Sequence, residues 1–241
     1  MFYTRIPVPK STGFSPENLN KATKYFPLVG IIVGGVGAMS FLAAYQLFSV
    51  YIAILISIVT MILLTGAFHE DAFADFCDGY GGGYSKEKIL AIMKDSLIGT
   101  YGTVGLILLL LAKLLLIAEF NPSQIPLILI IAHALSRVNP VILIFTSKYI
   151  GDENTSKSKP IGQKSSTTTL IIALLFGMLP LVLISPLIIP FLIFVQAIIF
   201  IYFRHFIQKQ TGGYTGDVLG ALQQLSEVGF YLTYLIVSQL R

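Results

Sequence analysis

The apolar run VYIAILISIVTMILLTGAF, residues 50–68, leads directly into HEDAFADFCDGYGGG, residues 69–83, and this junction decides the fold. A helix of about 20 apolar residues is long enough to cross the hydrocarbon core of a membrane. Similar runs occupy residues 26–48, 50–68, 103–118, 125–147, 169–187, 188–206 and 217–240. The sequence therefore predicts an all-α, polytopic integral membrane bundle of about seven transmembrane helices. Six result if the fifth and sixth runs form one broken span.

The composition excludes a water-soluble enzyme. Of the 241 residues, 55% are hydrophobic and only 12% are charged, whereas soluble proteins carry about 25% charged residues. The net charge of +4 comes without a basic cluster interleaved with aromatic residues, so nucleic acid is not an expected partner. Residues 1–241 are expected to form a single transmembrane catalytic domain in contact with the lipid bilayer.

The positions of the Lys and Arg residues indicate the orientation. With a cytoplasmic N-terminus, 13 of the 16 basic residues fall in loops on the cytoplasmic side. Because positive charge collects in cytoplasmic loops, we expect a multi-pass protein of the cell (inner) membrane. The loop of residues 69–102, which holds six of the twelve acidic residues, then makes an active site that faces the cytoplasm.

Carboxylates recur at helical spacing directly after the second apolar run. No proline separates that run from the acidic stretch, so one continuous helix is expected. At about 100° per residue, Asp71, Asp75 and Asp78 share one face of this helix. Like charges at this spacing repel each other, and a bound cation relieves the repulsion. Mg²⁺ typically binds one or two carboxylates together with substrate phosphates. A magnesium site is preferred here over a solvated helix end.

The glycine-rich segment after the carboxylates is expected to break the helix and let backbone approach a ligand, or to be only a flexible turn. Ser85 then N-caps a helix that runs to about Ile98. Asp95 returns to the carboxylates as a further ligand or stays on a solvated face. The candidate substrate-binding residues of this segment are Gly81, Gly82, Gly83 and Lys94.

A second glycine block precedes the last apolar run. Gly212 and Gly213 come shortly before a helix start, where exposed N–H groups attract phosphate. Thr215 contacts the substrate or simply caps that helix. Asp217, in its first turn, is a candidate second metal ligand or ribose ligand.

Two cationic residues lie inside predicted spans. Arg137 shares a helix face with His133, and its planar guanidinium suits bidentate binding of a phosphate. The alternative is a structural pairing of Arg137 with Glu227 or Gln223. Lys113 lies about six residues from the end of its span and is expected to extend its ammonium group to the membrane surface.

HEDAFADFCDGYGGG, with AIMKDSLIGTYG at residues 91–102, resembles the cobalamin synthase family, the adenosylcobinamide-GDP ribazoletransferases. The likeness includes FYTRIPVP at residues 2–9, YFPLVG at residues 25–30, the Ser136–Arg137 pair and GGYTGDVLGA at residues 212–221. These blocks occur in the order of the family across nearly the whole chain. The chain departs from the family at Ala72, where Gly is usual, and at residues 151–164, which lack an Arg- and Gly-containing loop.

The resemblance implies a membrane enzyme that joins adenosylcobinamide-GDP to α-ribazole, or its 5′-phosphate, with release of GMP and with Mg²⁺ as cofactor. A hydroxyl group attacks a phosphorus atom, and a divalent cation offsets the charge that builds on the phosphoryl oxygens. The formation of a homo-oligomer stays open. The candidate catalytic residues are Glu70, Asp71, Asp75 and Asp78, and the candidate metal ligands are Asp71, Asp75, Asp78, Asp95 and Asp217.

Two other functions remain as alternatives. A CDP-alcohol phosphatidyltransferase-like enzyme spaces Asp residues around D-x-x-D-G, and Asp75, Asp78 and Gly79 match that start. The Ala-Arg pair expected after it is missing. A carboxylate-based cation transporter would place acidic groups near the middle of the bilayer, whereas these carboxylates lie at one membrane face.

Overall fold

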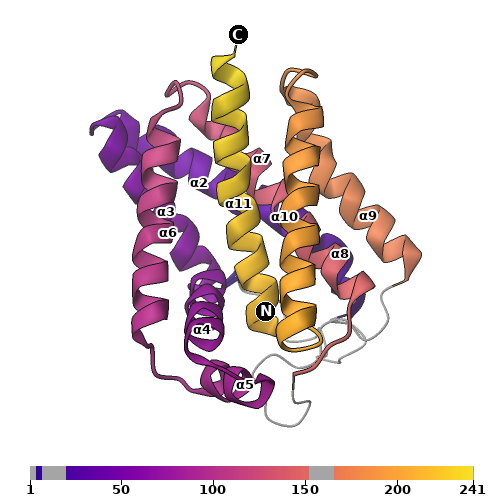
Figure 1. The fold of residues 1–241 in the computed structure, drawn as a ribbon. Helices are drawn as coiled ribbons and strands as arrows, with labels where there is room; N and C mark the ends of the chain where they lie inside the picture. Colours follow the sequence, from indigo (N-terminus) through magenta and orange to yellow (C-terminus); the bar gives the residue numbers. More distant parts are fainter. Residues whose placement is uncertain (1–3, 7–19, 152–165, 241) are drawn as a thin grey trace.

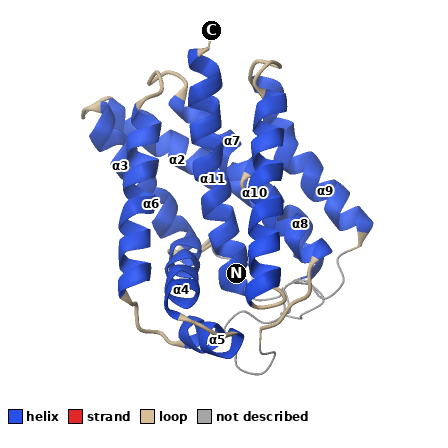
Figure 2. Ribbon diagram, viewed as in Figure 1, coloured by secondary structure: helices blue, strands red, loops and turns tan. Residues whose placement is uncertain are grey.

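The computed structural model describes residues 4–6, 20–151 and 166–240. Its helices form one bundle, and the described chain has no strand beyond an isolated bridge between Tyr149 and Tyr214 (Figures 1 and 2). Several of the basic residues used to predict the orientation, Lys10 and those within residues 152–165, lie outside the described residues. The elements are η1(Thr23–Tyr25), α2(Phe26–Tyr45), α3(Val50–Thr65), α4(Phe68–Gly82), α5(Lys86–Lys94), α6(Thr100–Ala118), α7(Ile125–Leu135), α8(Val138–Thr146), α9(Thr167–Met178), η2(Leu179–Leu183), α10(Ile189–Gln210) and α11(Gly216–Gln239).

The predicted all-α polytopic membrane fold is confirmed, with helices in all seven predicted ranges. Four described helices are long and apolar enough to cross a membrane: Asn20–Tyr45, Thr100–Ala118, Ile125–Thr146 and Ile189–Gln210. A fifth span results if α3 and α4 are counted as one broken span. By this measure the count is lower than seven because α9 is short and α11 carries several polar side chains along its length.

The prediction that the second span continues as a straight helix into the acidic stretch is wrong. The chain bends by 88° between α3 and α4. Gly66 has φ 71° and donates its N–H to the carbonyl of Leu63, while Ala67 donates to Ile62. This is the hydrogen-bond pattern of a Schellman motif, which ends a helix and favours glycine at the left-handed position. The acidic helix α4 therefore runs in its own direction across the bundle.

The fourth predicted span is divided into α7 and α8, which continue each other across a two-residue interruption at Ser136 and Arg137. Pro140 explains the interruption, because a proline has no N–H to donate to the carbonyl of Ser136 four residues earlier. Most of this span is buried inside the bundle. It therefore forms part of the protein core rather than of the lipid-facing surface.

Helices α2 and α7 approach each other closely through a pair of glycines. Gly30 and Gly34 are spaced by four residues on α2 and face the backbone of α7. A Cβ atom at Gly34 would lie 2.6 Å from the carbonyl oxygen of Leu129. Small residues at this spacing let transmembrane helices come into backbone contact.

We expect the substitution Gly34→Leu to separate these two helices and to lower the free energy of unfolding by about 1–3 kcal/mol, the usual cost of overpacking a core. Gly35→Ala is the matched control, since a Cβ atom there meets no other atom within 4 Å. Thermal unfolding in detergent compares the two variants. Equal stability of Gly34→Leu and Gly35→Ala would show that the close contact is not required.

Helix α11 is the central helix of the bundle and is buried along most of its length, between α4, α6, α7, α8 and α10 (Figure 1, yellow). Glu227 of α11 is 1% exposed and forms an ion pair with Lys113 of α6. The Nζ atom of Lys113 lies 3.0 Å from Oε1 of Glu227. Tyr231 and Gln223 also donate to the Glu227 carboxylate, at 3.2 and 2.9 Å. Lys113 is only 5% exposed, so the prediction that it extends to the membrane surface is wrong. At this depth the Lys113 ammonium group has Glu227 as its counter-charge instead of water at the membrane surface.

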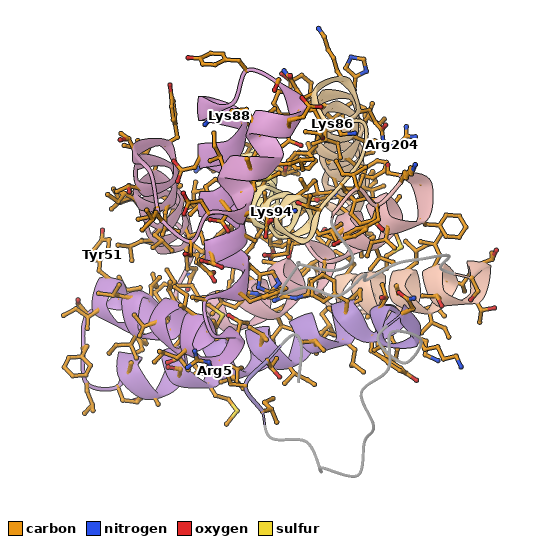
Figure 3. All side chains as sticks on the ribbon, turned by 90° about the horizontal axis from the view of Figure 1, so that it is seen from below. Arg5, Tyr51, Lys86, Lys88, Lys94 and Arg204 are labelled. Atoms are coloured by element: carbon orange, nitrogen blue, oxygen red, sulfur yellow. The ribbon has the colours of Figure 1, made fainter. Side chains whose placement is uncertain are left out.

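One end of the bundle carries exposed basic side chains. Lys86, Lys88 and Lys94 lie on α5, at the lower end of the bundle in Figure 1, and the view from below shows Arg204 on the same side as Lys86, with Arg5 apart from them (Figure 3). Arg204 donates to Ser147 and to the carbonyl of Thr146 at the end of α8. The basic side chains of α5 thus lie toward one end of the bundle, and the membrane face that this end adopts stays a prediction.

Candidate active site

The three predicted aspartates of the acidic stretch lie on one helix, α4, but in different surroundings. Asp71 is exposed, Asp75 is half-buried and Asp78 is buried at 7% exposure. Asp71 lies on the exposed side of the first turn of α4, whose His69 and Glu70 are buried, whereas Asp78 lies where α4 meets the start of α6. The shared helix face was predicted correctly, while the three side chains differ in what they can reach.

Asp78 binds the backbone at the start of α6. Its Oδ2 atom accepts the N–H of Gly99 at 2.6 Å, and its Oδ1 atom accepts the N–H of Gly102 at 2.8 Å. The first N–H groups of a helix have no partner within the helix, so a carboxylate there stabilises the helix by hydrogen bonds and by charge. The glycines also make room, since a Cβ atom at Gly102 would collide with the Asp78 carboxylate.

Replacing Asp78 by Ala should therefore destabilise the protein as well as change its chemistry. We expect a loss of about 1–2 kcal/mol in the free energy of unfolding, the usual cost of removing a helix cap. Thermal unfolding in detergent measures this, with Asp95→Ala as the comparison. Asp95 is exposed and caps only the short turn at Leu97. A fully stable Asp78→Ala would contradict the capping role.

Asp71 of α4 and Asp217 of α11 influence each other across the interface between the two helices. Burial, together with the charge of Asp71, raises the pKa of Asp217 to about 6. Asp217 lies in the first turn of α11, beside Thr215. Two negatively charged carboxylates repel each other, and a cation placed between them would relieve this repulsion.

Within the described residues, no group of three or more His, Cys, Asp or Glu side chains is close enough to hold a metal ion. The five predicted metal ligands are thus not gathered into one protein cage. Asp78 is engaged by α6, and Asp95 lies in the loop after α5. Asp71 and Asp217 remain, in the first turns of two helices that pack together. Mg²⁺ commonly uses such a limited set, because substrate phosphates and water complete its coordination.

Glu70 and His69 point into the bundle. Glu70 is 8% exposed and accepts a hydrogen bond from Gln224 of α11, at 2.9 Å, while its Oε2 atom has no partner in the described structure. His69 stacks on the ring of Phe26 with centroids 5.9 Å apart. These contacts hold α4 against α11 and α2, and the catalytic role of Glu70 stays a prediction.

The first glycine segment does not break the helix where the sequence suggested. Gly81 and Gly82 lie within α4, and Gly83 follows it as the C-cap. A Cβ atom at Gly81 would lie 2.6 Å from the ring of Tyr101 in α6, and one at Gly83 would lie 2.6 Å from Ile89 in α5. At Gly81 and Gly83 the absence of a side chain lets the neighbouring helices approach α4. Their contact with substrate stays a prediction, as does that of Gly82.

The second glycine block joins two loops at the start of α11. Gly212 has φ 80°, and a Cβ atom at Gly213 would collide with the carbonyl oxygen of Lys148. Tyr214 donates its N–H to that same oxygen at 3.0 Å. Thr215 accepts the N–H of Val218 and N-caps α11, which confirms the capping alternative. The arrangement holds Asp217 opposite α4.

The helix after the first glycine segment begins as predicted and ends earlier. Ser85 caps α5 by accepting the N–H of Lys88, at 3.3 Å. The helix stops at Lys94 rather than near Ile98, because Asp95 takes an extended conformation and accepts the N–H of Leu97. Lys94 is exposed at the basic end of the bundle (Figure 3).

Arg137 is enclosed in the bundle at 1% exposure. Its Nη1 atom donates to the carbonyl of His133 at 2.7 Å, and its guanidinium lies 5.4 Å from the ring centroid of Phe26. The predicted alternative partner, Glu227, instead accepts Lys113 at 3.0 Å and lies 3.6 Å from His133. Arg137 thereby links α2 to the α7–α8 junction, and its contact with a phosphate stays a prediction.

Sequence reasoning missed a pocket at the bend between α3 and α4. The pocket has a volume of about 450 Å³ and is lined by residues 4, 5, 65–68 and 71. Arg5 and Asp71 contribute opposite charges to its wall. No local pattern predicts it, because its wall combines the N-terminal segment with residues more than fifty positions later. The bend itself creates the concave surface.

The chain is similar to proteins of one family over nearly its whole length. The family model for cobalamin-5-phosphate synthase matches residues 1–235. Proteins named adenosylcobinamide-GDP ribazoletransferase from Shewanella halifaxensis and Vibrio cholerae are each 43% identical to the chain, over 98% and 99% of it and 92% of their own length. A relative of the same name from Shewanella pealeana is 44% identical over 98% of the chain and 92% of its own length. No solved structure matches. The chain therefore belongs to the cobalamin-5-phosphate synthase family.

Proposed function

We propose that the protein is a Mg²⁺-dependent transferase that joins adenosylcobinamide-GDP to α-ribazole, or to its 5′-phosphate, and releases GMP. Membership of the family and the names of the relatives support these substrates. The observation that carries the proposal is the packing of the first turns of α4 and α11, where Gly220 lies against Ala72 and Gln224 donates to Glu70, so that Asp71 and Asp217 lie on adjoining turns of the two helices.

The reaction needs a site that handles negative charge. A hydroxyl oxygen of the ribazole forms a bond to the phosphorus next to the cobinamide, and the bond from that phosphorus to the GMP oxygen breaks. GMP leaves with the electron pair of the broken bond, and one of the site carboxylates accepts the proton of the hydroxyl. Catalysis of this kind depends mainly on positioning and on electrostatic stabilisation.

The described residues fit a magnesium ion held partly by substrate. Asp71 is exposed, and burial raises the pKa of Asp217. When bound, Mg²⁺ offsets charge on the phosphoryl oxygens of the diphosphate. Asp75, half-buried one turn after Asp71, lines the same helix face and orients the substrate groups that reach this pair.

We further propose that this end of the bundle faces the cytoplasm from the inner membrane. Basic side chains of α5 and Arg204 of α10 lie there, with Arg5 on the α3 side of the same view (Figure 3). Positive charge near membrane spans marks the cytoplasmic side. The anionic donor and acceptor then reach the carboxylate pair past a basic rim, which favours their association by electrostatic attraction.

A purified-protein assay tests the proposal. The protein in detergent or nanodiscs is supplied with adenosylcobinamide-GDP, α-ribazole or its 5′-phosphate, and Mg²⁺, and both GMP and the corrinoid product are quantified. One GMP is expected for each product molecule. A folded protein that releases no GMP with either acceptor contradicts the proposal. CMP release from CDP-alcohols, or cation flux into proteoliposomes, would instead support the alternative functions.

A further inference from the structure

The pocket at the α3–α4 bend has the size of a small-molecule site. Its volume of about 450 Å³ falls within the range of about 300–1,000 Å³ that is common for ligand pockets. Asp71, which the proposed function assigns to the reaction centre, forms part of its wall. A ligand in the pocket therefore lies next to the place where phosphoryl transfer is proposed to occur.

The backbone of Arg5 is anchored at this pocket. The Arg5 N–H donates to the carbonyl oxygen of Leu64 at 2.8 Å. Leu64 is the penultimate residue of α3, where carbonyl groups lack a partner within the helix. This hydrogen bond connects the N-terminal segment to the end of α3 and places Arg5 on the wall of the pocket.

The side chain of Arg5 lies close to the bend because Gly66 has no side chain in its way. A Cβ atom at Gly66 would lie 2.6 Å from the Nε atom of Arg5. Gly66 also has φ 71°, a conformation that other residues rarely adopt. Glycine at this position therefore serves both the helix end and the placement of the guanidinium.

The two charged groups of the wall define the chemistry of an occupant. The Arg5 guanidinium suits a phosphate, which it can bind through two parallel hydrogen bonds. Asp71, from a different element, faces the part of the ligand that reacts. A ligand with a phosphate group at one end and an attacking hydroxyl group on its ribose can interact with both Arg5 and Asp71. A mononucleotide has these groups and suits a pocket of this volume, whereas a corrinoid with its appended nucleotide is far larger.

We propose that this pocket takes the acceptor nucleotide and that Arg5 binds its 5′-phosphate. Arg5 thereby sets the preference for the phosphorylated acceptor over the free nucleoside. The inference rests on the proposed function, since it assigns one of the two substrates to a place in the same site. Asp71 then lies between the acceptor in the pocket and the donor diphosphate near Asp217.

The test compares the two acceptors in wild type and in Arg5→Gln. We expect kcat/KM for α-ribazole 5′-phosphate to fall about 10- to 100-fold in the variant, the usual effect of losing hydrogen bonds between charged groups. The value for α-ribazole should stay within about 2-fold of wild type, because that acceptor has no phosphate for Arg5 to bind. The KM for adenosylcobinamide-GDP should not change. Arg204→Gln, which removes another exposed arginine, is the comparison: any loss of electrostatic attraction there should affect the phosphorylated acceptor and adenosylcobinamide-GDP alike, not the phosphorylated acceptor alone.

An equal fall in kcat/KM for both acceptors would overturn the assignment, because Arg5 would then make no specific contact with the acceptor phosphate. A raised KM for adenosylcobinamide-GDP would also overturn it and would indicate that Arg5 binds the donor. Should Arg5→Gln fail to fold by size-exclusion chromatography, Arg5→Lys replaces it. That variant keeps the charge but not the planar fork, so a smaller loss confined to the phosphorylated acceptor is expected. If wild type releases no GMP with either acceptor, the proposed function fails; if wild type is active and the Arg5 variants keep the wild-type preference, only this assignment fails.

Discussion

Asp75→Asn is expected to lower GMP release by at least about 100-fold, the order of loss that follows when one preorganised electrostatic group is removed from an active site. Asn keeps the shape of the side chain and removes its charge. Asp75 is half-buried on the face of α4 that also carries Asp71. The loss should therefore reflect the chemistry rather than the fold.

Two measurements accompany this variant. Size-exclusion elution and thermal unfolding should match wild type, because Asn fits the same space. Glu87→Gln, an acid-to-amide change in the first turn of α5, is the matched control, since Glu87 is fully exposed. We expect it to retain wild-type turnover. If Asp75→Asn keeps more than about half of the wild-type turnover, Asp75 does not take part in the reaction.

The largest effect on stability is expected from Lys113→Met. This change leaves the Glu227 carboxylate buried without the ammonium group that lies 3.0 Å away. Breaking a buried ion pair on one side costs about 3–5 kcal/mol, because the remaining charge is neither solvated nor paired. The free energy of unfolding in detergent, or the unfolding temperature, measures the loss. Lys209→Met, at an exposed position of α10, is the control.

A double variant separates charge from packing. Lys113→Met combined with Glu227→Gln removes both charges and leaves an amide that Gln223 and Tyr231 can still approach. We expect it to recover part of the stability lost in Lys113→Met alone. If the double variant is less stable than the sum of the single changes predicts, or if Lys113→Met is as stable as wild type, the ion pair does not hold α6 to α11.

Local sequence patterns predicted the helices and their caps well. Apolar runs placed helices in all seven ranges, and Ser85 and Thr215 cap the helices that follow them. These features depend on neighbours along the chain, namely on hydrophobic length and on a side-chain oxygen before a helix start. The shared face of Asp71, Asp75 and Asp78 depends only on the helical period and was predicted for the same reason.

Features that depend on distant partners were not predictable in this way. Lys113 looked free to reach the membrane surface because nothing near it in the sequence reveals Glu227, its partner 3.0 Å away. The bend between α3 and α4 starts at Gly66, a local helix-end signal that the sequence analysis overlooked, and continues through Ala67 at φ 58°, which local propensity disfavours for alanine. Asp78 was grouped with the metal ligands because its contacts with Gly99 and Gly102 arise only when α6 folds back on α4.

The dependence of GMP release on free Mg²⁺, compared in wild type and Asp217→Asn, tests the central claim most directly. We expect wild-type turnover to stop in EDTA, to return with added Mg²⁺ and to saturate. In Asp217→Asn the Mg²⁺ concentration for half-maximal turnover should rise at least about 10-fold, because one of the two carboxylates that attract the ion is lost. Full wild-type turnover in EDTA, or the same Mg²⁺ dependence in both proteins, would contradict a carboxylate pair that holds magnesium against the diphosphate.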